Sequence, residues 1–144
     1  MRLRIATTLR FVVGTTALAI GIVPASASAQ SAADQIALGD REHVAMNAPA
    51  ALQHYEAAIA LDARSYEALW KATREAVDVG EFNASPTERD RLYTLAEQYA
   101  RRAVEANPAD AEGHFHLARA LGRRALSLGK KDQVKYAKEV RDEA

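Results

Sequence analysis

The chain has 144 residues, of which 49% are hydrophobic and 26% are charged, and this is enough for one compact domain. Its 19 Lys and Arg balance 19 Asp and Glu, so there is no basic excess to contact phosphates and we expect no nucleic-acid partner. Cysteine is absent, which excludes disulfides, thiolate metal sites, a lipidated cysteine and covalent haem attachment.

The first part of the sequence has the pattern of a secretory signal peptide. An uncharged apolar run of 13 residues, Phe11 to Val23, is followed by small residues. A membrane span needs about 20 such residues, so an uncleaved anchor is a weaker interpretation, as is a buried N-terminal helix. A buried helix would explain the apolar run but not the small residues after it or the basic residues before it, which are Arg2, Arg4 and Arg10.

The small residues predict cleavage between Ala29 and Gln30. We therefore expect residues 1–29 to be removed and residues 30–144 to form a periplasmic or secreted domain, without stable membrane insertion after cleavage. Loss of the three arginines leaves 16 basic and 19 acidic residues, so the mature domain is mildly acidic.

Turn and capping residues predict six helices in the mature chain. Ser65, Ser85 and Asp110 are expected N-caps, Glu88 completes a capping box with Ser85, and Gly80 is expected to end the third helix. Because the connecting turns are short, sequential helices should be antiparallel in an all-α fold. The expected ranges are about 32–46, 49–61, 66–79, 86–106, 111–128 and 131 onward.

The first two helices resemble a tetratricopeptide repeat, a helix pair of roughly 34 residues with fixed small and aromatic positions. Ala51, Tyr55 and Ala58 match the small, aromatic and small positions of its second helix, and Leu38 and Gly39 match the Leu-Gly pair of its first. The resemblance implies a short right-handed solenoid of stacked antiparallel helix pairs, in units over about 32–65, 66–110 and 111–144.

The second and third units depart from this pattern. The second fits only if about eleven extra residues separate its helices, some within 80–87 and the rest in a longer helix. In the third, the apolar spacing of Val134, Ala137 and Val140 continues without a stop signal. We therefore expect an incomplete last unit, from a longer repeat array, with the apolar face of its final helix exposed.

A narrower resemblance comes from two stretches, EALW at 67–70 and YARRAVEANP at 99–108. They are similar to the helical-repeat proteins called regulators of microtubule dynamics and to their bacterial relatives. This resemblance implies the same helical architecture.

The repeat resemblance also implies a binding face, because the first helix of each unit lines a concave surface. Trp70 and Phe115 would form an aromatic floor beside Arg74 and Arg119, suited to an extended peptide that carries a carboxylate. The alternative is that both aromatic residues belong to the core. If the arginines are exposed, replacing both by Ala should weaken binding and change stability by only about 0.5 kcal/mol. The two predicted rows are Ile36, Trp70 and Phe115, and Asp40, Arg74 and Arg119.

The sequence contains only weak signatures of metal binding, phosphate binding or catalysis. His114 and His116 lie two residues apart on a helix and point in different directions, so they cannot share a metal ion, and His114 is assigned to a packing position. Gly80 and Gly129 are isolated and fit helix ends better than a phosphate loop. We expect no catalytic residue, metal or cofactor.

The sequence thus predicts a non-enzymatic scaffold that binds a protein or peptide. The alternatives are a helical bundle that carries a non-covalent cofactor or lipid between Met46 and His114, and a helical enzyme subunit.

Overall fold

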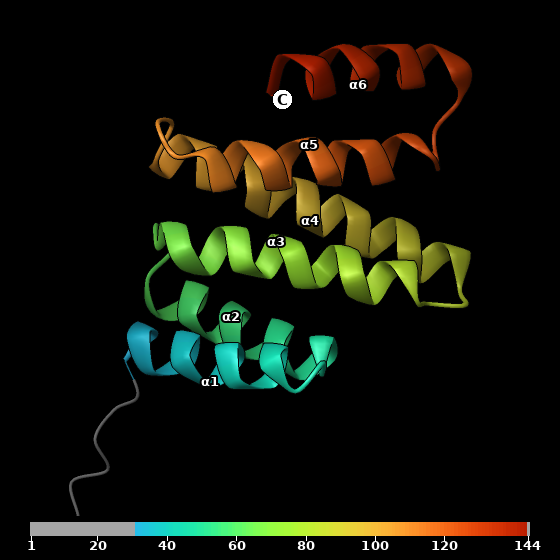
Figure 1. Cartoon of the computed structure of the whole chain (residues 1–144). Coiled ribbons are helices and arrows are strands. Elements are labelled where there is room, and N and C mark those ends of the chain that lie inside the picture. Colours follow the sequence, from blue (N-terminus) through green and yellow to red (C-terminus); the bar gives the residue numbers. More distant parts are fainter. Residues whose placement is uncertain (1–30, 144) are drawn as a thin grey trace, which may run out of the picture.

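A computed structural model describes residues 31–143. This part of the chain contains six α-helices and no strand, which confirms the all-helical prediction. Three antiparallel hairpins lie one above another (Figure 1), and α3 also contacts α5 across the stack. The helices are α1 (Ala32–Val44), α2 (Ala48–Leu61), α3 (Tyr66–Glu81), α4 (Pro86–Ala106), α5 (Ala111–Ala125) and α6 (Lys130–Glu143).

The predicted signal peptide, with Ala29 and Gln30 at its cleavage site, lies outside the described residues. Within residues 31–143, no helix combines the length and the hydrophobicity that a bilayer span requires.

The predicted N-caps are confirmed. The side chains of Ser65 and Asp110 accept hydrogen bonds from backbone N–H groups of the first turns of α3 and α5. Ser85 Oγ accepts from the Glu88 N–H at 3.3 Å. The Glu88 carboxylate, however, pairs with Arg91 instead of reaching back to Ser85, so the predicted capping box is only half formed.

The first helix ends at Val44, two residues before the predicted position, because Met46 adopts a left-handed backbone conformation with φ of 59°. The Met46 N–H donates to the His43 carbonyl and the Asn47 N–H donates to the Glu42 carbonyl, both at 2.9 Å. These two bonds form a Schellman motif, in which glycine normally occupies the left-handed position. Met46 is 89% exposed.

Gly80 does not end the third helix, as the sequence suggested. It lies inside α3, where a Cβ atom would come within 2.6 Å of the Tyr93 ring in α4. Gly39 in α1 is equally close to Tyr55 in α2. Both glycines therefore allow close approach within a hairpin, and the chain leaves α3 only after Glu81. The predicted end of the fifth helix near residue 128 was also late, because α5 ends at Ala125.

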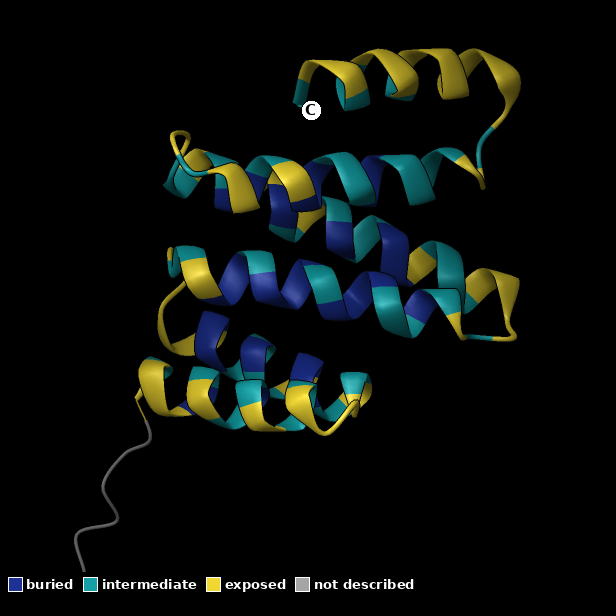
Figure 2. Ribbon diagram, viewed as in Figure 1, coloured by how far each residue is buried: buried dark blue, intermediate teal, exposed yellow. Residues whose placement is uncertain are grey.

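The buried residues of the core lie along α2, α3, α4 and α5 (Figure 2). Alanine is the most frequent residue among them. Alanines with no exposed surface line α2, α3 and α4, which lets these helices approach closely. The helix α6 has no buried residue. Its Val134 is 61% exposed, but Tyr136 and Val140 pack against the core, so only part of its apolar face is exposed.

The middle hairpin is longer than the first. The helix α4 has 21 residues against 14 in α2, and α3 has 16 against 13 in α1. The tip of the α3–α4 hairpin therefore projects beyond the α1–α2 hairpin (Figure 1). The predicted lengthening of the second unit accounts for this projection.

Candidate binding face

The predicted site residues lie on α1, α3 and α5, the first helices of the three hairpins. Each pair, such as Trp70 and Arg74, is spaced by four residues and therefore occupies one side of its helix. We call this side of the three helices the binding face.

The two aromatic residues of the first row are joined through His116, which the sequence analysis did not place there. The Trp70 and His116 rings stack with centroids 5.3 Å apart, and Phe115 contacts His116 edge-on at 5.0 Å. Trp70 is half-buried, whereas Phe115 is 61% exposed, so the predicted aromatic floor is present only in part. Ile36, the third member of the row, packs against the core.

Two cations flank the tryptophan ring. The Lys71 Nζ atom lies 5.6 Å from the Trp70 centroid and the Arg74 Cζ atom lies 5.4 Å from it. Both distances are within the range of cation–π attraction. The indole ring is therefore in contact with two cations and with the His116 ring.

The second row does not form a continuous line of free charges. Asp40 binds Lys71 Nζ through both carboxylate oxygens, at 2.7 and 2.8 Å, and accepts a hydrogen bond from the Tyr55 hydroxyl at 2.7 Å. Burial alone would raise the pKa of Asp40, but these bonds from Lys71 and Tyr55 outweigh it and lower the pKa below its ordinary value. Lys71 links α3 to α1 in this way.

Arg74 binds a carboxylate that the sequence analysis missed. Its Nε atom lies 2.7 Å from Glu75 Oε1, and His43 Nδ1 lies 2.9 Å from the same oxygen. The Glu75 side chain is only 1% exposed. A buried carboxylate needs such partners, because its desolvation is otherwise uncompensated. Spacing in the sequence could not reveal this, since Glu75 is one of many charged residues in α3.

Arg119 is also paired. It donates to Asp78 and, at 3.2 Å, to Glu81, and Arg123 binds the same Glu81 at 2.8 Å. The side chains of Arg74 and Arg119 are only 20% and 27% exposed. The premise that both arginines are exposed is therefore wrong. Removing Arg74 would leave Glu75 with His43 alone, and removing Arg119 would take one partner from both Asp78 and Glu81.

The two histidines of α5 have opposite environments, and the packing position belongs to His116 instead of His114. His116 is 4% exposed, and its Nδ1 atom has no hydrogen-bond partner within residues 31–143. Burial, followed by the charges of Arg74 and Arg119, lowers the pKa of His116 to about 4. The imidazole is therefore neutral at physiological pH.

His114 is instead partly exposed and reaches the last helix. Its Nε2 atom lies 2.9 Å from the Pro108 carbonyl and its Nδ1 atom lies 2.6 Å from Glu143. These two interactions, the carbonyl first, raise the pKa of His114 above its ordinary value.

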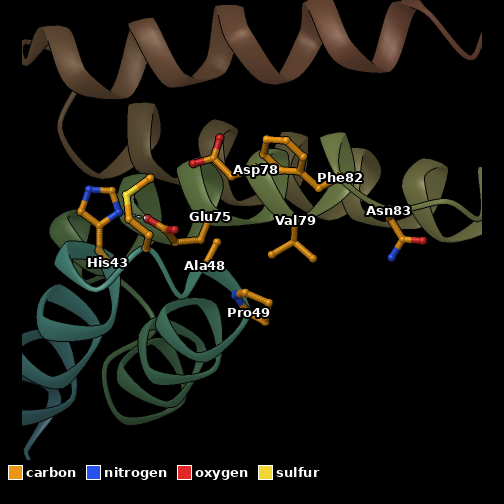
Figure 3. Close-up of a pocket in the computed structure, with 9 residues that line it drawn as sticks. His43, Ala48, Pro49, Glu75, Asp78, Val79, Phe82 and Asn83 are labelled. Atoms are coloured by element: carbon orange, nitrogen blue, oxygen red, sulfur yellow. Dashed lines mark ion pairs between the residues drawn. The ribbon is translucent and has the colours of Figure 1, made fainter.

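A pocket of about 410 Å³ opens beside the binding face, where the projecting part of α3 passes the end of the α1–α2 hairpin. Val79 of α3 and Pro49 of α2 face each other across it (Figure 3), and Met46 and Phe82 also line it. Glu75 lies at the end next to His43. We call this hollow the step pocket.

Within residues 31–143, no three His, Cys, Asp or Glu side chains gather closely enough to hold a metal ion. The groups on the binding face are instead arranged as ion pairs and stacked rings, an arrangement that stabilises contacts between helices and leaves the Phe115 ring exposed.

Comparison with known protein families identifies the family of this chain. The sequence profile of the family "Regulator of microtubule dynamics protein 1-3" matches residues 30–144, and the chain belongs to this family. The match confirms the narrower resemblance inferred from the sequence. A search of curated proteins finds no match.

Proposed function

We propose that the chain is a non-enzymatic scaffold that binds a peptide or protein segment on the binding face of α1, α3 and α5. The observation that carries this proposal is the Phe115 ring, which is 61% exposed and contacts edge-on the buried His116, itself stacked on the half-buried Trp70. An aromatic side chain held in place before binding loses little conformational freedom when a partner covers it.

We further propose that the hairpins are tetratricopeptide-like units in a short right-handed solenoid. The contact of Gly39 with Tyr55 supports this, because both residues occupy positions at which the repeat pattern places a small and an aromatic residue. The contact of α3 with α5 also supports it, since stacked repeats bring their first helices together.

A peptide carboxylate would bind Arg119 by replacing the carboxylates that pair with it now. The present partners of Arg119 are Asp78 and Glu81, whose side chains are 29% and 24% exposed, so both can turn to water when a ligand replaces them. Such exchange keeps the guanidinium paired throughout. This chemistry favours a peptide that carries a carboxylate near its aromatic contact.

We also propose that the scaffold acts in the periplasm or outside the cell, after removal of residues 1–29. The arginines and the apolar run at the N-terminus support this, and the family match begins at Gln30, the first residue of the predicted mature chain.

The proposal is tested by capturing partners from a bacterial envelope extract on immobilised wild type and on the variant Phe115→Ser. Leu61→Ser is the matched control, because Leu61 is 57% exposed at the end of α2, away from the face. We expect Phe115→Ser to lose the partner that wild type and Leu61→Ser recover. Equal recovery by all three proteins, with equal thermal stability, would show that the face is not the binding site.

A further inference from the structure

The step pocket exists because the middle hairpin is longer than the first, and it opens beside the binding face. We propose that it holds one apolar side chain of the bound peptide and that a basic residue of the peptide lies next to this side chain. The inference rests on the proposed function, because it specifies a second contact for the same ligand. The volume of about 410 Å³ lies in the range of small-ligand sites, which suits a single large side chain.

Exposed apolar residues gather at this corner of the molecule. Phe82 is 90% exposed and Met46 is 89% exposed, and both line the pocket. Val44, at the end of α1, is 81% exposed. Single exposed apolar residues are ordinary, but several around one concave site indicate a surface that a partner covers.

The backbone at Met46 gives an independent indication. Its φ of 59° is a conformation that glycine adopts without strain and methionine does not. The position thus keeps a large apolar side chain where glycine would fit better, and it presents that side chain to the pocket. Strain of this kind is more common at functional sites than elsewhere.

The charge of the pocket selects the neighbouring residue of the ligand. The lining includes the carboxylates of Glu75 and Asp78 but no Lys or Arg. Glu75 is enclosed by His43 and Arg74. Asp78 is 29% exposed, and its contact with Arg119 involves Oδ1, so Asp78 is the carboxylate that can meet a ligand cation. A peptide Lys or Arg fits here, whereas a lipid phosphate would be repelled.

The pocket is continuous with the binding face through shared residues. Glu75 lines the pocket and also pairs with Arg74 beside Trp70, while Asp78 lines the pocket and pairs with Arg119. An extended peptide that covers Phe115 can therefore run along α3 and place its next apolar side chain between Val79 and Pro49.

The probe is a phage-displayed library of random peptides, selected on the purified wild-type protein. Enriched peptides are synthesised, labelled and titrated by fluorescence anisotropy against wild type and against the double variant Met46→Gly/Phe82→Ser. The control is Leu61→Ser/Val134→Ser, which also removes two exposed apolar side chains but lies outside the pocket. All the substituted residues are exposed, so the variants should fold.

We expect the enriched peptides to share an apolar residue beside Lys or Arg. Their binding should weaken about tenfold or more in Met46→Gly/Phe82→Ser and remain unchanged in the control, since burial of an apolar anchor dominates such interfaces. Replacing the basic residue of the peptide by Glu should weaken binding to wild type in the same way.

The outcomes separate the two proposals. If Met46→Gly/Phe82→Ser binds the peptides as wild type does while Phe115→Ser loses them, the step pocket is not an anchor site and the binding face stands. If wild type enriches no peptide above the bare support, the proposed function fails and this inference fails with it. If phosphatidylglycerol vesicles displace the peptides from wild type, the pocket is a lipid site and the inference is overturned.

Discussion

Gly39 of α1 lies directly against the ring of Tyr55 in α2, so that a Cβ atom on this glycine would be 2.5 Å from Tyr55 Cε1. The ring of Tyr55 is held in place by its surroundings. Tyr55 is 0% exposed within the core, and its hydroxyl donates to Asp40 at 2.7 Å. The separation of α1 and α2 is therefore set by the absence of a side chain at this one position.

We predict that Gly39→Ala destabilises the protein by about 1–3 kcal/mol, because the overlap with a fixed ring exceeds the gain in helix propensity. Gly122→Ala is the matched control, since Gly122 is also helical and a Cβ atom there would meet nothing within 4 Å. The control should be neutral or up to about 1 kcal/mol more stable. Urea unfolding measures both, and equal stability of the two variants would contradict the prediction.

Met46→Gly should stabilise the protein by about 0.5–1 kcal/mol. Glycine relieves the left-handed conformation, with φ of 59°, and this gain exceeds the entropy that glycine adds to the unfolded chain. Because Met46 is 89% exposed, little packing is lost. Met46→Ala keeps the unfavourable conformation and should show no such gain in chemical denaturation. A stabilisation by Ala equal to that by Gly would rule out the backbone explanation.

The buried His116 should make the protein less stable in acid. The pKa of His116 is about 4 in the folded chain, against about 6.5 for an exposed imidazole. The unfolded chain therefore binds the proton more tightly. The stabilisation is fully present above about pH 6.5 and is lost as the pH falls to about 4, by roughly 1–3 kcal/mol.

The variant His116→Phe isolates this effect, because it keeps a ring on Trp70 and removes the titrating group. As the pH is lowered from 7 to 5, the unfolding free energy of this variant should increase relative to that of wild type. The effect of carboxylate titration is common to both proteins and cancels in the difference. His114→Gln serves as the control. Since the pKa of His114 is raised, the contribution of His114 to stability changes only above about pH 6.5. The variant His114→Gln should therefore still lose stability between about pH 6.5 and pH 4, as wild type does. A difference between wild type and His116→Phe that is independent of pH would refute the prediction.

Arg74→Ala should lower the stability by about 1–3 kcal/mol, because it leaves the buried carboxylate of Glu75 with His43 alone. Arg91→Ala is the control. Arg91 also pairs with a glutamate, Glu88, but the two side chains are 59% and 39% exposed, so the change should stay within about 0.5 kcal/mol. If both substitutions have the same effect on thermal unfolding, burial of Glu75 does not govern the stability of the pair.

Export is tested by the mass of the protein made in a bacterial host. We expect a mature chain that begins at Gln30 and is recovered from the periplasmic or extracellular fraction, because the first 29 residues have the pattern that signal peptidase recognises. Replacing Ala29 by a bulky residue, as in Ala29→Leu, should block cleavage and increase the mass accordingly. Intact protein in the cytoplasm would require the export proposal to be withdrawn.

The helix starts were predictable because their signals are local. Ser65, Ser85 and Asp110 each act on N–H groups within three residues of themselves, so the sequence alone contains the full interaction. The glycines were harder to interpret. Gly80 looks like a helix stop, and only the position of Tyr93 on the next helix reveals that it serves close packing.

The binding face was predicted in outline only. The repeat pattern places Trp70, Arg74 and Phe115 on the first helices, as the structure does. It does not determine the partners of the charged residues, because these depend on how far one helix is rotated and shifted against the next. The burial of Glu75 and the insertion of His116 between the two aromatic rings are consequences of this three-dimensional arrangement.

The last helix contacts the rest of the protein through Tyr136 and Val140, which pack against the core, and through three polar links. It has no buried residue, and its polar links to the rest are Arg101 with Glu139 at 2.7 Å, the Tyr136 hydroxyl with Glu97 at 3.0 Å, and His114 with Glu143 at 2.6 Å. Ionic links weaken with salt, and the histidine link is lost as the pH rises through the raised pKa of His114. We therefore expect α6 to open at a lower free energy than α2, α3 and α4, so that its amide protons exchange in salt or mild alkali while those of α2, α3 and α4 remain protected.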